Sequence, residues 1–96
     1  MLFIATCVDK PHSVEKRKGN RPAHLAYLNG LGARVKTGGA LLGPDHQTLV
    51  GSMIIFEGES EDHILALLAT DPYSMAGLFE SVSVKPWRQA VGQALA

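Results

Sequence analysis

The sequence predicts a small α+β domain in which four strands form one sheet and two helices cover one of its faces. Three observations lead to this prediction. Four segments are apolar or alternating and have the length of strands, two longer segments have helical periodicity, and the helical segments separate the strands along the chain. A chain of 96 residues has room for one hydrophobic core, so we expect a single domain spanning residues 1–96.

The first third of the chain is predicted to form a strand, a loop and a helix. Residues 1–8, "MLFIATCV", are apolar and rich in strand formers, which is typical of a buried central strand. The charged segment 12–20 is expected to be a solvated loop. Residues 21–35 are predicted to be a helix with Pro22 in its first turn. One helical stripe of this segment carries His24, Tyr27, Leu28, Leu31 and Val35.

The middle of the chain is predicted to form a hairpin. Two strand-like segments, 38–43 and 48–58, flank the turn-forming cluster "GPDHQ" at residues 43–47. The next segment, 59–70, has an apolar helical stripe, and Ser60 is a suitable N-cap for it. We therefore expect two antiparallel strands followed by a second helix.

The last part of the chain is predicted to supply the fourth strand. Residues 78–87 alternate between apolar and polar side chains, as in a half-buried strand. The closing segment 88–96 is compatible with a short helix or with a frayed tail. The resulting order is strand–helix–strand–strand–helix–strand, the split βαβ pattern of ferredoxin-like α+β domains.

This topology brings His24 and Asp71 together. In a ferredoxin-like sheet the strand order is fourth, first, third, second, so the start of the first helix and the end of the second helix lie at the same end of the sheet. His24 is expected in the first turn of one helix and Asp71 at the last turn of the other. Both lie on the stripe that faces the sheet, so two residues 47 positions apart are predicted to be neighbours.

A histidine beside a carboxylate is the minimum equipment of a general base, because the carboxylate fixes the tautomer and raises the basicity of the ring. His24 and Asp71 are therefore the candidate catalytic residues. Ser74, three residues beyond Asp71, could donate a hydrogen bond to substrate or act as a nucleophile. Arg21 could bind an anionic group of a substrate. We take Ser74 and Arg21 as candidate substrate-binding residues.

Other interpretations of these residues stay open at this point. Asp71 followed by Pro72 also suits the N-cap of a short helix, and a single histidine on an apolar stripe is often a core residue. Cys7 is a minor alternative as nucleophile. The sequence is compatible with a lyase or isomerase, with a non-catalytic small-molecule-binding or accessory module, and with a cofactor-free barrel monooxygenase. Solvent access to His24 separates the first two.

Composition excludes several classes of function. Nine basic and nine acidic residues give no electrostatic footprint for nucleic acid or an anionic membrane, and no apolar run reaches the roughly 20 residues of a membrane span. One cysteine indicates a reducing, cytoplasmic environment. The other histidines, His12, His46 and His63, lack the spacing of a metal site. We expect no metal, no cofactor, and a small molecule as ligand.

Three segments resemble the YciI-like family, also described as the YCII-related domain. They are "RPAHLAYL" at 21–28, "GGALLGP" at 38–44 and "ATDPYSMAGLFESVSVKPW" at 69–87, and the resemblance covers nearly the whole chain. It implies a ferredoxin-like fold that dimerises into an α/β barrel, and a cleft whose His–Asp pair maps onto His24 and Asp71. Some relatives are dehydrochlorinases that act on chlorinated hydroxyquinones, with histidine, aspartate and serine implicated. A homodimer would also cover the sheet face that the helices leave open.

Overall fold

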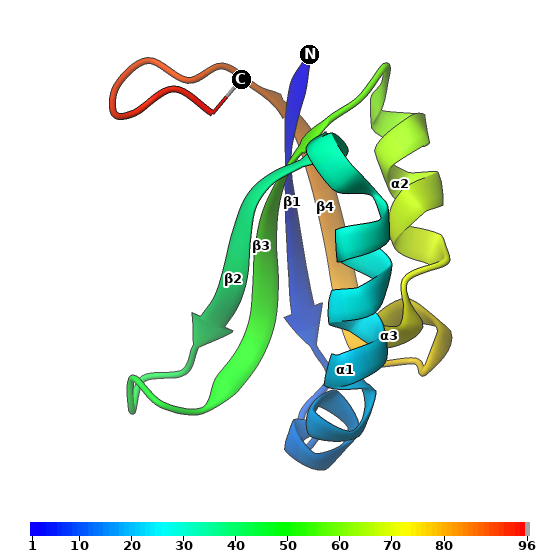
Figure 1. The fold of residues 1–96 in the computed structure, drawn as a ribbon. Helices are drawn as coiled ribbons and strands as arrows, with labels where there is room; N and C mark the ends of the chain where they lie inside the picture. Colours follow the sequence, from blue (N-terminus) through cyan, green and yellow to red (C-terminus); the bar gives the residue numbers. More distant parts are fainter. Residues whose placement is uncertain (96) are drawn as a thin grey trace.

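The computed structural model describes residues 1–95 and shows a four-stranded antiparallel sheet covered on one face by helices (Figure 1). The elements in chain order are β1 (Leu2–Asp9), α1 (Val14–Gly30), the 3₁₀ turn η1 (Gly32–Arg34), β2 (Val35–Leu42), β3 (Leu49–Glu57), α2 (Glu61–Ala69), α3 (Pro72–Met75) and β4 (Phe79–Trp87). The strand order is β2-β3-β1-β4. The predicted fold class and sheet order are confirmed. No helix within residues 1–95 is long and apolar enough to cross a membrane.

The core lies between the sheet and the helices. Alternate side chains of a strand point to opposite faces of the sheet, so every second residue of β1 points toward the helices. The buried apolar cluster that results contains Phe3, Ala5 and Cys7 of β1, Ile54 and Phe56 of β3, and Ile64 and Leu68 of α2. Burial of this apolar surface is the main force that holds α2 on the sheet.

Helix α1 begins earlier than predicted. The segment 12–20 is not a solvated loop, because α1 starts at Val14. Val14, Arg17 and His24 follow one another at helical spacing, and Arg17 is only 3% exposed. A charged residue therefore occupies an inward position of the first turn, and the polar composition of the segment conceals the helical pattern.

Two positions within α1 change accordingly. Pro22 lies in the interior of the helix and not in its first turn, where its missing N–H removes one main-chain hydrogen bond. His24 lies near the middle of α1, although it still faces the second helical segment. The helix ends at Gly30, and β2 begins at Val35, three residues earlier than the expected strand.

The predicted hairpin between β2 and β3 is present. The N–H of Gly43 donates to the carbonyl oxygen of Thr48 at 2.8 Å. The carboxylate of Asp45 accepts the hydroxyl proton of Thr48 and the backbone N–H groups of Thr48 and Gln47. These hydrogen bonds, first of all that of the Thr48 hydroxyl, lower the pKa of Asp45 to about 2. The turn is thus held by local hydrogen bonds of the kind that aspartate offers.

The segment after α2 is a tight helical turn. Ser60 caps α2 as predicted, since its hydroxyl oxygen accepts the backbone N–H of His63 at 3.1 Å. Asp71 caps α3 by accepting the N–H of Tyr73. Gly77, with φ of +71°, ends α3 in the left-handed conformation that favours glycine. The turn therefore holds Asp71 and Tyr73 in fixed positions next to α1.

The segment after β4 contains no helix within residues 88–95, where the chain makes only bends. Of the two predicted possibilities, the described part agrees with the tail. The side chain of Val91, which lies in this segment, is 84% exposed. Figure 1 shows this segment projecting on the side of the sheet that faces away from the helices. Residue 96 lies outside the described residues.

Replacing Gly51 with alanine is expected to lower the free energy of unfolding by about 1–3 kcal/mol. A Cβ atom at this position of β3 would lie 2.4 Å from the carbonyl oxygen of Cys7 in β1, and a backbone atom in a central strand cannot move aside. Urea unfolding measures the loss. Gly39→Ala is the matched control, because no heavy atom lies within 4 Å of its added Cβ. Equal losses in the two variants would contradict this explanation.

Candidate functional site

A cavity of about 390 Å³ lies between α1 and the strands β2 and β3. The cavity exists because the residues of β2 that face α1, Gly38 and Ala40, have little or no side chain. Their direction follows from their partners in β3, Ile54 and Ser52, which point toward the helices. The lining residues are Arg17, Arg21, His24, Leu25, Leu28, Asn29, Val35, Gly38, Gly39, Ala40, Leu49, Ser52, Ile54 and Tyr73. The volume is in the usual range of small-molecule sites.

His24 and Asp71 are in direct contact at the wall of this cavity. The Nδ1 atom of His24 lies 2.9 Å from Oδ1 and 2.8 Å from Oδ2 of Asp71. Asp71 is completely buried and His24 is 6% exposed. Oδ1 also accepts the backbone N–H of Tyr73 at 2.9 Å, so the carboxylate is held by its own helix cap. The predicted proximity of the two residues is confirmed, and Asp71 is both a cap and a partner of the imidazole.

The contact determines which ring nitrogen of His24 carries the proton. An ionised carboxylate can only accept hydrogen bonds, so Nδ1 donates and the lone pair of the neutral ring is on Nε2. Within residues 1–95 no side chain bonds Nε2, and no buried side-chain nitrogen or oxygen lacks a partner. Nε2 is therefore reached by solvent from the cavity that His24 lines. A basic lone pair facing a cavity is the arrangement that a general base requires.

Tyr73 of α3 fixes the plane of the imidazole. Its ring stacks on His24 with 3.8 Å between the ring centres and an angle of 14° between the planes. The rings of Tyr73 and Phe79 pack edge to face, with 6.0 Å between their centres. Burial raises the pKa of Tyr73, against the opposing effect of Arg17 and Arg21. Tyr73 is thus a neutral phenol near neutral pH, and its buried ring cannot turn away from His24.

Arg17 is the main residue that sequence reasoning missed. Its Nε and Nη2 atoms donate to the two carboxylate oxygens of Asp9 at 2.6 and 2.9 Å, and Nη2 also donates to the hydroxyl of Ser52 at 3.0 Å. Burial alone would lower the pKa of Arg17, but the hydrogen bonds and charge of Asp9 outweigh it, and the net pKa is raised. The helical spacing from Val14 through Arg17 to His24 is the signal that could have placed Arg17 at the site.

The other predicted site residues have different positions. Arg21 is exposed and lines the cavity, one helical turn from both Arg17 and His24. Ser74 is half-buried in α3 and is not among the lining residues, so the structure does not bring it into the cavity with His24. Its predicted role stays a prediction. Within the described chain no group of three or more His, Cys, Asp and Glu side chains is placed to hold a metal ion.

The structure weighs against Cys7 as a nucleophile. The side chain is 1% exposed. Burial, and next the negative charge of Asp71, raise the pKa of the Cys7 thiol to about 12. The reactive form of cysteine is the thiolate, so the thiol of the folded protein is unreactive near neutral pH.

Iodoacetamide at pH 8 is therefore expected to leave Cys7 of the folded protein unmodified and to alkylate it readily in concentrated urea. The physical reason is that unfolding returns the thiol to its ordinary pKa of about 8.5 and exposes the sulfur. Mass spectrometry of timed samples measures the modified fraction. Alkylation of the folded protein at the rate of the unfolded chain would show that the thiol is accessible and ionised.

Comparison with known proteins relates the chain to one family. The family model described as the YCII-related domain matches residues 1–88. Protein YciI of Escherichia coli O6:H1 is 40% identical, with 93% of this chain and 98% of that protein covered. An uncharacterized protein of Haemophilus influenzae is 32% identical over the same shares. Among solved structures, the 5-chloro-2-hydroxyhydroquinone dehydrochlorinase TftG of Burkholderia phenoliruptrix AC1100, in complex with 2,5-dihydroxybenzoquinone, is similar with a TM-score of 0.84 and 37% identity, covering 94% of this chain and 96% of that one.

Proposed function

The chain belongs to the YCII-related domain family, and we propose that it is a small lyase- or isomerase-type enzyme that uses the His24–Asp71 pair for general acid–base catalysis. The substrate is a small polar cyclic or aromatic molecule. The observation that carries the proposal is the position of His24, whose Nδ1 is bound to buried Asp71 while Nε2 is open to a cavity. A purely structural pair would be sealed by side chains on both nitrogens.

In the proposed reaction, the Nε2 lone pair of His24 takes a proton from the substrate. The imidazolium that forms is stabilised by the carboxylate of Asp71, and Tyr73 keeps the ring in place. In an elimination, the electron pair of the broken bond forms a double bond and the leaving group departs with its own pair. In an isomerisation, the proton returns from Nε2 to a different atom of the substrate. After an elimination, the imidazolium passes its proton to water.

Two observations support a hydroxylated ring as the substrate class. The cavity of about 390 Å³ suits a molecule with one ring. The similar TftG structure is that of a dehydrochlorinase for a chlorinated hydroxyhydroquinone and contains a dihydroxybenzoquinone. In this proposal Arg21 contacts an anionic substituent at the exposed side of the cavity, and Ser74 contributes only to a substrate that extends beyond the cavity toward α3.

The experiment that tests this function begins with a thermal-shift screen of small hydroxylated aromatics and lactones. Molecules that bind, together with 5-chloro-2-hydroxyhydroquinone under anaerobic conditions, are then assayed for chloride release and for exchange of ring protons with D₂O. We expect turnover of at least one molecule, and a fall of roughly 10²–10⁴-fold in His24→Gln. His63→Gln, which changes a histidine near the start of α2, is the matched control and should retain the wild-type rate.

Binding without any turnover would contradict the enzyme and favour the non-catalytic binding module. The same conclusion follows if His24→Gln turns over substrate as fast as the wild type. A pocket that binds molecules through its shape alone would be insensitive to the lone pair of Nε2.

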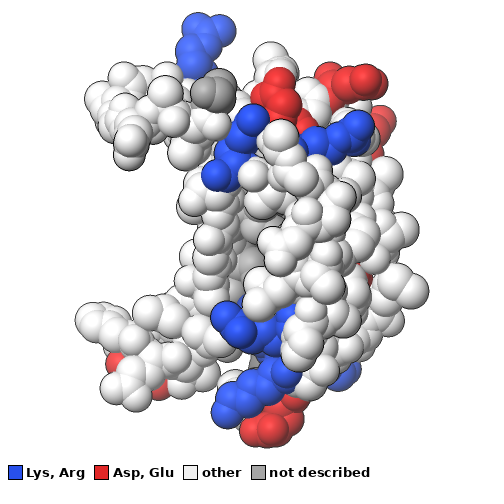
Figure 2. All heavy atoms as spheres, in the orientation of Figure 1, with Lys and Arg blue, Asp and Glu red and all other residues white. Residues whose placement is uncertain are grey.

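We also propose that the protein acts as a homodimer. The sheet face away from the helices carries apolar side chains that the single chain leaves partly or largely exposed, among them Ile4, Val8 and Met53, which the alternation of β1 and β3 directs away from the core cluster. Figure 2 shows a hollow with few charged residues on this side, between the β2–β3 turn and the segment after β4. A second copy would bury this face. Sedimentation at micromolar concentration should give the mass of a dimer, and a monomer would argue against the proposal.

A cytoplasmic location belongs to the same proposal. Its support is chemical: the chain has one cysteine, and Cys7 is a buried free thiol. Chains without disulfides are typical of reducing compartments. Cell fractionation with compartment markers tests the location, and recovery outside the cytoplasmic fraction would contradict it.

A further inference from the structure

The cavity presents a second polar atom besides Nε2 of His24, and it belongs to Arg17. The Nε and Nη2 atoms of this guanidinium are bound to Asp9 and Ser52. The hydroxyl oxygen of Tyr73 is also near enough to accept from the guanidinium, and this contact contributes to the raised pKa of Arg17. Apart from that contact, no group within residues 1–95 is hydrogen-bonded to Nη1, and no buried side-chain nitrogen is left without a partner. Nη1 is therefore open to solvent, although Arg17 as a whole is 3% exposed. Arg17 lines the His24 cavity and the adjoining cleft next to the β2–β3 turn.

The position of Asp9 determines which way the positive charge of Arg17 is directed. The carboxylate covers the edge of the guanidinium formed by Nε and Nη2. The opposite corner, Nη1, keeps its N–H groups and lies on the side away from the counter-charge. Three hydrogen bonds hold the group in this orientation before any ligand arrives, which is the preorganisation that makes a donor effective toward developing negative charge.

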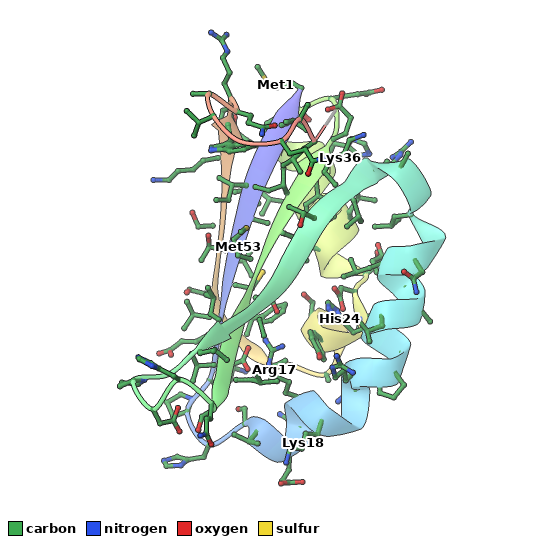
Figure 3. All side chains as sticks on the ribbon, turned by 60° about the vertical axis from the view of Figure 1, so that its left-hand side comes forward. Met1, Arg17, Lys18, His24, Lys36 and Met53 are labelled. Carbon is green, nitrogen blue, oxygen red and sulfur yellow. The ribbon has the colours of Figure 1, made fainter. Side chains whose placement is uncertain are left out.

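Tyr73 sets the spacing between this donor and the base. Its ring centre lies 3.8 Å from that of His24 and 4.7 Å from Cζ of Arg17. The centre of the imidazole ring and Cζ of the guanidinium are therefore no farther apart than the sum of these two distances. One six-membered ring with its oxygen substituents can bridge that span. Figure 3 shows Arg17 and His24 in the space between α1 and the sheet.

We propose that Arg17 is the anion-binding residue of this cavity, and that its Nη1 binds the substrate oxygen that becomes negative when Nε2 of His24 takes a proton. The proposal rests on the proposed function and narrows its substrate class. The substrate carries a hydroxyl or keto oxygen conjugated with the atom that loses the proton. The electron pair of the broken bond moves through the conjugated system to that oxygen. In an elimination, the pair then moves back into the ring and the leaving group departs with its own electrons. In an isomerisation, the pair moves back and another carbon takes up a proton.

Arg21 does not fill this role. Its side chain is exposed on the same helix, and water screens its charge and competes for its N–H groups. Arg17, in contrast, is enclosed by Asp9, Ser52 and the ring of Tyr73. The two arginines therefore differ as donors: Arg17 is fixed and buried, whereas Arg21 is solvated.

The probe for the test is 4-nitrocatechol, a hydroxylated ring that ionises near neutral pH and whose visible absorption band moves when it does. A positively charged neighbour lowers the pKa of a bound phenol, by roughly one to three for a charge within hydrogen-bond reach. We expect the wild-type protein to bind the anion more tightly than the neutral form and to lower the pKa of the bound probe accordingly. A spectrophotometric pH titration of the bound probe measures it.

The decisive variant is the double substitution Asp9→Leu/Arg17→Met, which removes both buried charges and leaves no unpaired carboxylate. It should lose at least about tenfold in affinity for the anion and return the pKa of the bound probe to its free value. Asp9→Asn/Arg17→Gln, a neutral hydrogen-bonding pair, serves the same purpose if the first variant fails to fold. Lys16→Met is the control, because Lys16 is an exposed cation one residue before Arg17 and does not line the cavity, and it should leave the pKa of the bound probe at its wild-type value.

The same titration in a His24→Gln background removes the base, so that any remaining effect on the probe belongs to Arg17. An unchanged pKa and affinity in both double variants would overturn the assignment, as would a wild-type protein that does not bind the anion. If the probe behaves as expected but no substrate is turned over, the anion site stands and the proposed enzyme fails. If turnover is found but the pKa and affinity of the bound probe do not depend on Arg17, only the assignment of Arg17 fails.

Discussion

Replacing Arg17 with methionine is expected to lower the free energy of unfolding by about 3–5 kcal/mol. The substitution removes the donors that bind Asp9 at 2.6 and 2.9 Å and leaves a carboxylate that is 8% exposed without its counter-charge. The cost comes mainly from that stranded charge and not from the lost attraction. For a domain whose total stability is on the order of 5–15 kcal/mol, such a loss moves the urea midpoint strongly or prevents folding.

The double variant Asp9→Leu/Arg17→Met separates the two contributions. Because it removes both charges, we expect it to recover most of the stability that the single variant loses. Lys16→Met is the matched control, since Lys16 is exposed one residue earlier in α1 and should change the free energy of unfolding by no more than about 0.5 kcal/mol. A loss in Arg17→Met no larger than in Lys16→Met would show that the buried pair does not have the importance given to it here.

Replacing Asp71 with asparagine is expected to slow turnover of a substrate by roughly 10²–10⁴-fold while leaving the fold intact. Asparagine has the size of aspartate and can still accept the N–H of Tyr73 as an N-cap. It has no charge to stabilise the imidazolium of His24. Its NH₂ group would also meet Nδ1, which lies within 2.9 Å of both carboxylate oxygens, and would favour the tautomer with the proton on Nε2.

The rate is measured by chloride release or ring-proton exchange, together with the urea midpoint. Asp71→Ala is the comparison, because it removes the cap as well and should cost a further 0.5–2 kcal/mol or so of stability. An Asp71→Asn variant that is folded and as active as the wild type would mean that the carboxylate serves only to cap α3.

The sequence was sufficient to predict the sheet order and the contact between His24 and Asp71. Both depend on regular patterns: apolar alternation in strands, and one stripe in each helix. The start of α1 was not predicted, because a run such as "VEKRKGN" at 14–20 has the composition of a solvated segment. Arg17 is the residue that distinguishes this segment from a solvated one, because its long side chain binds the buried carboxylate of Asp9. That contact forms only when β1 and α1 pack together.

The remaining parts of the site were not predictable from local patterns for the same reason. In the sequence Asp9 simply follows the predicted strand 1–8, and Ser52 is one polar residue within the apolar segment 48–58. Their roles depend on the pairing of β1 with β3, which brings both to the side chain of Arg17. In α3 it is Tyr73, and not Ser74, that lines the cavity, because the helix is only one turn long and its orientation is set by the cap at Asp71.

The most direct test of the account is the tautomer of His24 in the folded wild-type protein, read from long-range ¹⁵N–¹H NMR of the histidine rings at a pH where His24 is neutral. The account predicts that Nδ1 carries the proton and that Nε2 is unprotonated and changes its ¹⁵N shift when a ligand enters the cavity. A proton on Nε2, with Nδ1 unprotonated, would contradict it, because His24 would then have no lone pair to offer a substrate.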